Sequence, residues 1–462
     1  MSPQQVTEGL RALLGTERVS TEPGLLDTIS WDALGEARIH PDKRPVVCPP
    51  LCVVTPRSVS EVRSVVLFAN REKTPIVPYG GGSGLMGGAL SVRASIVVDL
   101  RSMNRIFQVD KEALSARAQA GVVLEDLNAK LAESGLMLGH DPWTVPVATV
   151  GGTISTNSLG YRGARYGSMG DQVLGLEAVL PNGEVLRTRA VPKSSTGISL
   201  KHLLIGGEGC FGIITEATLR VFITPEKRSL FVFRFATFEE GFAAVQDLFA
   251  ADLKPILLDL GDDPSKVQKG AVLYLGFEGC AAIVEIEEKR ALACCEGRNG
   301  KRMENEAAEA LWDDRHVIAR EFKHNRQRRR IPPRGELSRD WVHVALPASN
   351  VLAFRKRAIE IVSRRGVGVQ ESGLWTRPEM FSLRLAVMVG NDDAQQRVLE
   401  DTLEEVLRLV QDCGGSMEYC HGVGVKLAPL MEREHGYGLQ VMRQIKQALD
   451  PNAIMNPGKL GL

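Results

Sequence analysis

The amino-acid sequence predicts an α+β fold divided into two domains. With 462 residues, the chain is too long for one ordinary hydrophobic core. Glycine is frequent, at 46 residues, and many glycines fall in the first half of the chain, in loops between short β-branched runs. The second half alternates longer strand and helix patterns. We therefore expect a loop-rich, ligand-binding domain over residues 1–225 and a second domain over residues 226–449.

Composition excludes several classes of protein. Lys+Arg and Asp+Glu both number 56, so the chain has no excess of basic charge with which to bind nucleic acid. The apolar runs are short and interrupted by charge, which argues against a transmembrane segment. The N-terminus lacks a basic patch followed by an apolar core, and the eight cysteines show no CxxC spacing. We expect a cytoplasmic protein with reduced thiols.

The first region begins as a β-α-β unit that leads into a glycine-rich loop. Ser58 and Glu61 have the spacing of a capping box, and the apolar residues after them share one helix face. A strand at 74–77 follows, Pro78 fixes the turn after it, and the loop 80–88 is mostly glycine. Glycines can adopt φ > 0 and bring backbone N–H groups close to an anion such as a pyrophosphate. Taken alone, such a loop is equally consistent with a surface turn.

Residues 82–87 also satisfy the G-x-G-x-x-G pattern of a dinucleotide-binding Rossmann unit. In that unit the loop opens a helix, and the second strand comes after the helix. Here the next strand, at 95–100, follows after only a handful of residues. The spacing therefore excludes a Rossmann unit.

Two further glycine-rich segments follow. Residues 139–171 combine glycine with Ser, Thr and Asn, which suits a backbone that wraps a flat polar ligand. Residues 206–217 supply the third loop, and a hairpin with its turn at 181–183 lies between the two.

The second region predicts an antiparallel sheet with helices on one side, because strand and helix patterns alternate along it. The strand patterns lie at 231–235, 271–277, 341–346 and 381–389, and the helical patterns at 238–250, 281–293, 351–364 and 394–412.

Four motifs together resemble the vanillyl-alcohol-oxidase (PCMH-type) FAD flavoproteins. They are Pro-x-Gly-Gly-Gly-x-Gly after a strand, Thr-x-Gly-Gly-x-x-x-x-Asn, Gly-x-Glu-Gly-x-x-Gly-Ile-Ile-Thr, and Asn-Pro-Gly-Lys at 456–459. The chain is most similar to the branch of D-lactate and D-2-hydroxyglutarate dehydrogenases, glycolate oxidase subunits and alkylglycerone-phosphate synthase. The resemblance implies a PCMH-type FAD-binding domain of two subdomains, residues 1–225 completed by the tail 450–462, and an antiparallel-sheet cap domain over residues 226–449.

The resemblance also implies how FAD is held. Relatives with covalently attached FAD often carry a histidine in or beside the glycine loop, where this chain has Ser83, so we expect non-covalent FAD with His140 as the residual candidate for a covalent link. The implied FAD-binding residues are Pro78, Gly80, Gly81, Gly82, Ser83, Gly84, Asp141, Pro142, Thr149, Gly151, Gly152, Ser155, Asn157, Glu208, Gly209, Ile214 and Asn456.

Two residues match catalytic positions of the relatives. Oxidation of an alcohol by a flavin needs a base for the hydroxyl proton and a group that binds the remaining charge of the substrate. His421 stands where relatives carry Glu-His-Gly or His-His-Gly, and an imidazole can take a proton near neutral pH. Arg315, in Leu-Trp-x-x-Arg, matches an arginine that clamps a carboxylate in the hydroxyacid enzymes. The alternatives are a structural histidine beside glycines and a surface salt bridge.

Two departures from the relatives leave the substrate open. The zinc-using hydroxyacid dehydrogenases carry a His-x-Gly-Asp-Gly-Asn-x-x-His strand, whereas the matching strand here contains no histidine, and Cys420 replaces the Glu before the motif histidine. We therefore expect no catalytic metal. Trp375, Arg377 and Arg384 in that strand would shape a different pocket. The ether-lipid synthase has three consecutive histidines at the motif, of which this chain keeps one.

The resemblance predicts hydride transfer from a 2-hydroxy acid or related alcohol to flavin N5, with an unknown electron acceptor. Two alternatives stay open: a synthase or lyase reaction through a substrate–flavin adduct, and a flavin subunit of a glycolate-oxidase-like complex. A homodimer is common among relatives. The basic run at 323–330 is either a solvated loop or an electropositive mouth for an anionic substrate or a membrane surface.

Overall fold

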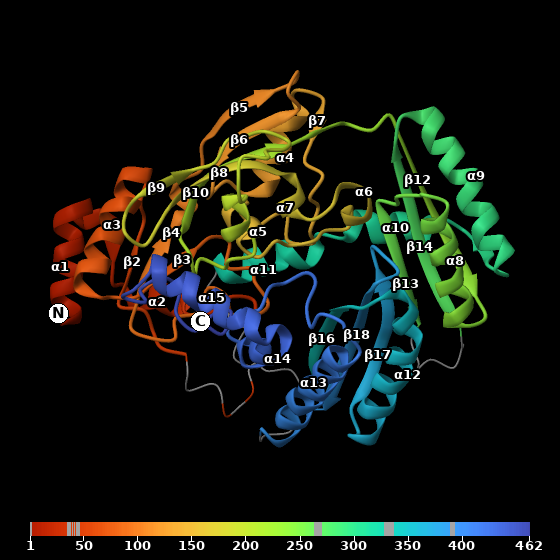
Figure 1. Ribbon diagram of the computed structural model, residues 1–462. Coiled ribbons are helices and arrows are strands. Elements are labelled where there is room, and N and C mark those ends of the chain that lie inside the picture. The colour runs from red at the N-terminus through yellow and green to blue at the C-terminus, as the bar shows by residue number, and fades with distance from the viewer. Residues whose placement is uncertain are drawn as a thin grey trace.

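The computed structural model describes residues 2–34, 38, 40, 42, 47–262, 270–327, 337–388 and 393–462. Figure 1 shows two lobes, with the smaller sheets of the first region on one side and the large sheet of the second region on the other. The C-terminal helices run back beside the N-terminal region. The α+β class predicted from the sequence is confirmed.

The first sheet places the glycine-rich loop. Its strand order is β1-β2-β4-β3, in which β2, β4 and β3 are parallel. The helix after β2 is capped by Ser58, whose Oγ accepts from the Glu61 N–H at 3.2 Å. The Glu61 carboxylate accepts from the Arg57 N–H rather than from Ser58, so only half of the predicted capping box forms. The elements are α1 (Pro3–Leu14), β1 (Val19–Ser20), α2 (Pro23–Ile29), β2 (Cys52–Val54), α3 (Val59–Glu72), β3 (Ile76–Tyr79) and β4 (Ile96–Asp99).

The chain passes from β3 to β4 through the glycine-rich loop with no helix between them, so the exclusion of a Rossmann unit is confirmed. The tail lies beside this loop: Met455 bridges Ile76, and the Asn456 N–H donates to the Ile76 carbonyl at 2.8 Å. Helix α15 contacts the same region through Lys446, whose Nζ donates to the Cys210 carbonyl at 2.7 Å. The last elements are α13 (Ala394–Asp412), α14 (Met431–His435) and α15 (Tyr437–Leu449).

A second, antiparallel sheet completes the first region, with strand order β5-β6-β10-β8-β9. The predicted hairpin around 181–183 is confirmed as β8 and β9. Strands β7 and β11 form a separate two-stranded antiparallel sheet. The elements are β5 (Ile106–Asp110), β6 (Ser115–Gln119), α4 (Leu124–Ala132), β7 (Leu136–Met137), α5 (Val150–Ser155), α6 (Gly163–Tyr166), α7 (Met169–Gln172), β8 (Val173–Val179), β9 (Val185–Arg187), β10 (Ile213–Arg220) and β11 (Phe222–Ile223). Short 3-10 helices lie at Thr16–Arg18, Leu100–Ser102, Leu200–Leu203 and Ala428–Leu430.

The second region is a seven-stranded antiparallel sheet, β15-β12-β14-β13-β17-β18-β16, with helices on one face (Figure 1). Helices α12 and α13 pack on the half of the sheet formed by β16, β17 and β18, and α8 and α9 on the half formed by β12 and β14. In β16 and β18 alternate residues are buried under the helices, and most of the others form an open face that is only half-buried. The elements are β12 (Lys227–Phe235), α8 (Phe238–Ala250), β13 (Leu257–Asp262), β14 (Ala271–Gly279), α9 (Ala281–Gly297), β15 (Lys301–Met303), α10 (Glu306–Asp314), α11 (Val317–Gln327), β16 (Leu337–Ala345), α12 (Ala348–Arg364), β17 (Gly368–Trp375) and β18 (Met380–Met388).

Helix α11 leads from the second region back onto the glycine-rich loop. Arg326 donates to the Gly82 carbonyl at 2.6 Å and to the Thr28 carbonyl at 2.9 Å. Arg320 and Lys323 form ion pairs with Glu125. The described part of the basic run is therefore helical and attached to the first region, which corrects the prediction of a solvated loop. The rest of the run, 328–330, lies outside the described residues. No helix in the described ranges is long and apolar enough to cross a membrane.

Candidate active site

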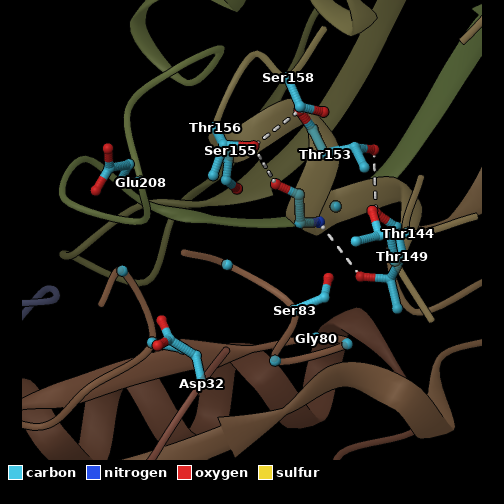
Figure 2. A pocket seen from close by; sticks show the side chains of 18 of the residues that line it. Asp32, Gly80, Ser83, Thr144, Thr149, Thr153, Ser155, Thr156, Ser158 and Glu208 are labelled. Atoms are coloured by element: carbon cyan, nitrogen blue, oxygen red, sulfur yellow. Dashed lines mark hydrogen bonds between the residues drawn. The ribbon is translucent and has the colours of Figure 1, made fainter. Parts of the chain in front are cut away.

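A cavity opens where the three glycine-rich segments meet the loop around His421 (Figure 2). It encloses about 1200 Å³ when its open mouth is included, which accommodates a ligand larger than most small molecules. Most of the residues predicted to bind FAD line it: Pro78, Gly80, Gly81, Gly82, Ser83, Gly84, Pro142, Thr149, Gly151, Gly152, Ser155, Glu208, Gly209 and Ile214.

The glycines are required because two loops approach each other closely. A Cβ on Gly81 would lie 2.2 Å from the Val147 carbonyl oxygen, and a Cβ on Gly80 would lie 2.4 Å from Thr149 Oγ1. Gly82 has φ = +60°, a conformation that favours glycine. Side chains on this loop would therefore separate it from the segment that forms the facing wall.

Hydroxyl groups cover that facing wall (Figure 2). Thr149 caps α5, with Oγ1 accepting from the Gly152 N–H at 3.3 Å, and Thr153 Oγ1 donates to the Thr149 carbonyl at 3.1 Å. Sequence reasoning missed several lining residues of this kind because they fall between the motif positions. They are Thr144, Thr153, Thr156 and Ser158. A backbone-rich loop opposite a hydroxyl-rich wall fits the polar linker of FAD.

Two predicted FAD-binding residues hold the loops together and do not line the cavity. Asn456 Nδ2 donates to the Gly88 carbonyl at 2.9 Å and to the Glu208 carbonyl at 2.6 Å. Asn157 Oδ1 accepts from the Gly170 N–H at 3.0 Å. Asn456 thus joins glycine-rich segments that are far apart in the sequence, whereas Asn157 holds together two parts of the second segment.

Glu208 positions the loop that carries His421. Its two carboxylate oxygens accept from the Val423 N–H at 2.5 Å and from the Gly424 N–H at 2.8 Å. Burial raises the pKa of Glu208 to about 7, although the two backbone donors oppose the shift.

Asp32 is a buried carboxyl group in the cavity wall, and it was missed in the sequence because it belongs to no motif. Its Oδ1 accepts from the Leu34 N–H at 3.0 Å, whereas its Oδ2 has no hydrogen-bond partner among the described residues. The residue is only 5% exposed, and burial raises its pKa to about 6. Figure 2 shows the carboxyl group beside the glycine-rich loop. An unpartnered acceptor of this kind is available to a hydroxyl group of a bound ligand.

His421 lies at one end of the cavity and forms an ion pair with Glu418. Its Nδ1 is 3.6 Å from Glu418 Oε1, and the same oxygen accepts from the His421 backbone N–H at 3.0 Å. Burial alone would lower the pKa of His421, but the adjacent Cys420 and Glu418 side chains outweigh it and raise the pKa to about 10. Glu418 responds in the opposite direction, because the charge of His421 outweighs burial and lowers the pKa of its carboxyl group.

The open face of the second-region sheet brings further side chains to His421. The ring centroids of His343 and His421 are 4.7 Å apart, and His343 Nδ1 is 2.8 Å from Ser382 Oγ. Shielding from water lowers the pKa of His343 to about 3, and the charge of His421 adds to the effect. Tyr419 contacts Ser382 Oγ at 2.9 Å and stacks against Trp375 at 6.3 Å. This arrangement was not predicted, because its members come from different strands.

Arg315 lies in a charge cluster and is not among the residues that line the cavity. Its Nε donates to Asp141 Oδ2 at 3.1 Å, and its Nη1 donates to the Trp312 carbonyl. Asp141 also contacts Arg162 at 2.7 Å and His316 at 3.2 Å. Burial would raise the pKa of Asp141, but the charges of Arg162 and Arg315 and the hydrogen bond with His316 outweigh it and hold the pKa well below its usual range. Asp141, predicted to bind FAD, and Arg315, predicted to clamp a substrate, are thus partners of each other.

His140, the residual candidate for a covalent link to FAD, is 1% exposed and does not line the cavity. Its Nε2 lies 2.9 Å from Ser158 Oγ, and burial lowers its pKa to about 4. Within the described ranges, no group of three or more His, Cys, Asp or Glu is arranged to hold a metal ion.

Comparison with known proteins agrees with this geometry. Residues 50–189 match the family described as FAD binding domain, and residues 224–460 match the C-terminal domain of FAD linked oxidases. The chain is 27% identical to the glycolate oxidase subunit GlcD of Bacillus subtilis, over 100% of this chain and 97% of that protein. It is 28% identical to D-lactate dehydrogenase of Anaerostipes hadrus, over 92% and 91% of the two chains.

The fold is also shared with solved structures. An alkyldihydroxyacetonephosphate synthase superposes with a TM-score of 0.79 at 22% identity, covering 98% of this chain and 86% of that one. A p-cresol methylhydroxylase superposes with a TM-score of 0.79 at 20% identity, covering 99% and 96%. Because the family match spans more than half of the chain and the cavity carries its motifs, the protein belongs to the FAD-linked oxidases, with FAD as its cofactor.

Proposed function

We propose that this protein oxidises an anionic alcohol, a 2-hydroxy acid or a close relative of one, and holds its FAD non-covalently in the cavity described above. The observation that carries the proposal is that His421 lines the same cavity as the glycine-rich loop. Relatives named for glycolate oxidation and for D-lactate dehydrogenation support this substrate class. When bound, FAD supplies the hydride acceptor.

The charge of His421 decides which role it takes. At neutral pH a group with a pKa near 10 is an imidazolium, which cannot accept the hydroxyl proton. It can donate a hydrogen bond to the hydroxyl oxygen and hold the substrate for reaction. The raised pKa therefore favours a role in orienting the substrate over the role of base expected from the sequence.

His343 is the group that we propose accepts the proton. It is neutral at pH 7, because its pKa is lowered to about 3, and its ring lies beside that of His421. Such a weak base is sufficient here, because loss of hydride from the carbon turns the attached hydroxyl into that of a protonated carbonyl, a far stronger acid. Ser382, at Nδ1, fixes the orientation of the ring.

The test is an anaerobic titration of the purified holoenzyme with a panel of D- and L-2-hydroxy acids. Loss of the flavin absorbance band with one enantiomer is the expected result. The rate constant of this reduction should fall as pH rises towards 10, because the donating imidazolium is then lost. A rate constant that instead rises with pH would make His421 the base, and a flavin that no hydroxy acid reduces would contradict the proposed function.

Two alternative functions can be tested on the same purified protein. Relatives include an alkyldihydroxyacetonephosphate synthase of Dictyostelium discoideum, 27% identical over 89% of this chain and 73% of that protein. Turnover without any electron acceptor would support a synthase or lyase reaction of that kind. Co-purification of an iron–sulfur protein would support a flavin subunit of a larger complex.

A further inference from the structure

An anionic substrate needs a cationic partner beside His421, and the arginine expected for that task is already engaged. The Nε and Nη1 atoms of Arg315 bind Asp141 and the Trp312 carbonyl, and its guanidinium lies 4.2 Å from the centre of the Trp312 ring. The question is therefore which other cation faces the site.

Arg384 is a cation without a counterion in the described part of the chain. Its Nε is buried and has no hydrogen-bond partner there. The guanidinium packs on the Trp341 ring, with Cζ 5.5 Å from the ring centre. Arg38 covers the same ring at 5.3 Å, but Arg38 is paired with Asp340 at 2.6 Å. A buried donor that lacks a partner is costly unless a ligand supplies one.

The strand register places Arg384 on the side of the sheet that faces His421. In the β16–β18 ladder, Trp341 pairs with Arg384 and His343 pairs with Ser382. Residues two positions apart on a strand point to the same face, so Arg384 shares the open face with Ser382. Ser382 in turn contacts His343, which lies against His421.

The carboxyl groups near this face do not neutralise Arg384. Glu371 pairs with Arg384 in the β17–β18 register and shares its face, but its Oε1 leans towards β13, the other neighbour of β17, where it lies 3.5 Å from the position of a Cβ on Gly261. Asp259, on the next strand, has its pKa raised to about 7 by burial and by Glu371, so its negative charge is only partial at neutral pH. Neither carboxyl group forms an ion pair with Arg384 in the part of the chain that the structure describes.

We propose that Arg384 binds the oxyanion of the substrate, a carboxylate or a phosphate, and thereby determines the substrate class of the site. This inference rests on the proposed function. A guanidinium presents two parallel N–H donors, which match either oxyanion. The substrate would then lie between Arg384, which binds its charge, and His421, which holds its hydroxyl group.

The experiment measures anion binding separately from oxidation. Holoenzyme is titrated with oxalate, an unreactive dicarboxylate, and in parallel with inorganic phosphate, by calorimetry and by the change in the flavin spectrum. Arg384→Met should weaken the preferred anion about 10- to 100-fold, as expected for a lost hydrogen bond to a charged group. Arg384→Lys, which keeps the charge but not the paired donors, should weaken it less. Whichever anion binds more tightly identifies the oxyanion as carboxylate or phosphate.

Arg302→Met is the matched control. Arg302 is an exposed arginine on the edge strand β15, where its guanidinium lies 5.3 Å from the centre of the Phe231 ring, as that of Arg384 lies over Trp341. This substitution should leave anion affinity unchanged. A second comparison uses a 2-hydroxy acid and its uncharged amide: Arg384→Met should raise the concentration needed for half-maximal reduction by the acid and leave that for the amide unchanged.

The outcomes separate the two proposals. Unchanged anion affinity in Arg384→Met, or its loss only in Arg315→Met, would overturn the role of Arg384. Tight anion binding that depends on Arg384, together with a flavin that no hydroxy acid reduces, would sustain the anion site and reject the oxidation. A wild-type holoenzyme that binds neither anion would overturn the assignment of Arg384 whatever the fate of the oxidation. If Arg384→Met does not bind FAD, the titration of Arg384→Lys replaces it: weaker anion binding would support the role of Arg384, and unchanged binding would overturn it.

Discussion

The two halves of the site are built in different ways. The cofactor half uses backbone: three glycine-rich segments converge, and a Cβ on Gly81 would lie 2.2 Å from a neighbouring carbonyl oxygen. The substrate half uses side chains on the open face of the second-region sheet, where His343 and Ser382 meet through strand pairing. Backbone packing tolerates no added atoms, whereas side chains can be exchanged without changing the sheet. This difference explains how one fold can keep its cofactor and change its substrate.

The largest effect that would test this comparison is loss of FAD from a glycine substitution. Gly81→Ala adds one methyl group in contact with the Val147 carbonyl, which neither loop can relieve without moving apart. We expect a colourless or unstable protein, measured as flavin absorbance per mole of purified chain. Gly82→Val should behave in the same way, because Gly82 has φ = +60°.

Gly84→Ala is the control in the same loop. A Cβ there would meet only Asp32 Oδ2 at 3.5 Å, an ordinary contact. This variant should keep its FAD. Equal FAD content in Gly81→Ala and Gly84→Ala would show that close packing of the loops does not determine cofactor binding.

The substrate half should respond in the opposite way, with activity lost and FAD retained. His421→Ala removes the donor to the substrate hydroxyl, and we expect the rate constant of flavin reduction to fall by roughly 10²- to 10⁴-fold. The flavin content and the melting temperature of the holoenzyme provide the check that the fold is intact. Reduction at the wild-type rate would remove His421 from the mechanism.

The features that could be predicted from the sequence depend on neighbouring residues, and those that could not depend on contacts between residues far apart in the chain. The glycine-rich loop, the 181–183 hairpin and the absence of a Rossmann helix were evident because each depends on neighbouring residues. Asp141 and Arg315 were each singled out, but their pairing joins positions 174 apart and replaces the two separate roles expected of them. Arg326 was seen only as part of a basic run, because nothing local shows that α11 lies across the glycine-rich loop. Asp32 carried no signal, since burial that leaves an oxygen unpartnered is a tertiary property.

A third, smaller effect concerns Asp32. Its carboxyl group should lower the stability of the apoprotein and increase the affinity for FAD. Burial raises its pKa in the folded protein from the ordinary 3.8 to about 6, so the folded apoprotein loses stability as pH rises from about 4 through 6. Asp32→Asn should therefore stabilise the apoprotein at pH 8 by about 1–3 kcal/mol. The same variant should weaken FAD about tenfold, because a hydroxyl of FAD loses its charged acceptor.

Thermal unfolding of the apoprotein and fluorescence titration with FAD measure these two quantities separately. Tighter FAD binding by Asp32→Asn would mean that the carboxylate repels the pyrophosphate and does not accept from a hydroxyl. If the Asp32→Asn apoprotein is no more stable than the wild-type apoprotein, burial of the Asp32 carboxylate does not destabilise the fold.

The smallest effect we expect is a change in the pH dependence of stability, set by the His421–Glu418 pair. His421 has its pKa raised from 6.5 to about 10, so its stabilising contribution is complete below about pH 6.5 and disappears as pH rises through 10. Glu418→Gln keeps an oxygen that can accept from the backbone N–H groups of the loop but removes a charge that, together with the Cys420 side chain, raises the pKa of His421. The difference in melting temperature between wild type and Glu418→Gln should therefore be larger at pH 7 than at pH 10. A difference that stays constant over this range would mean that Glu418 acts on the loop through hydrogen bonding alone, and His421 would then be free to serve as the base.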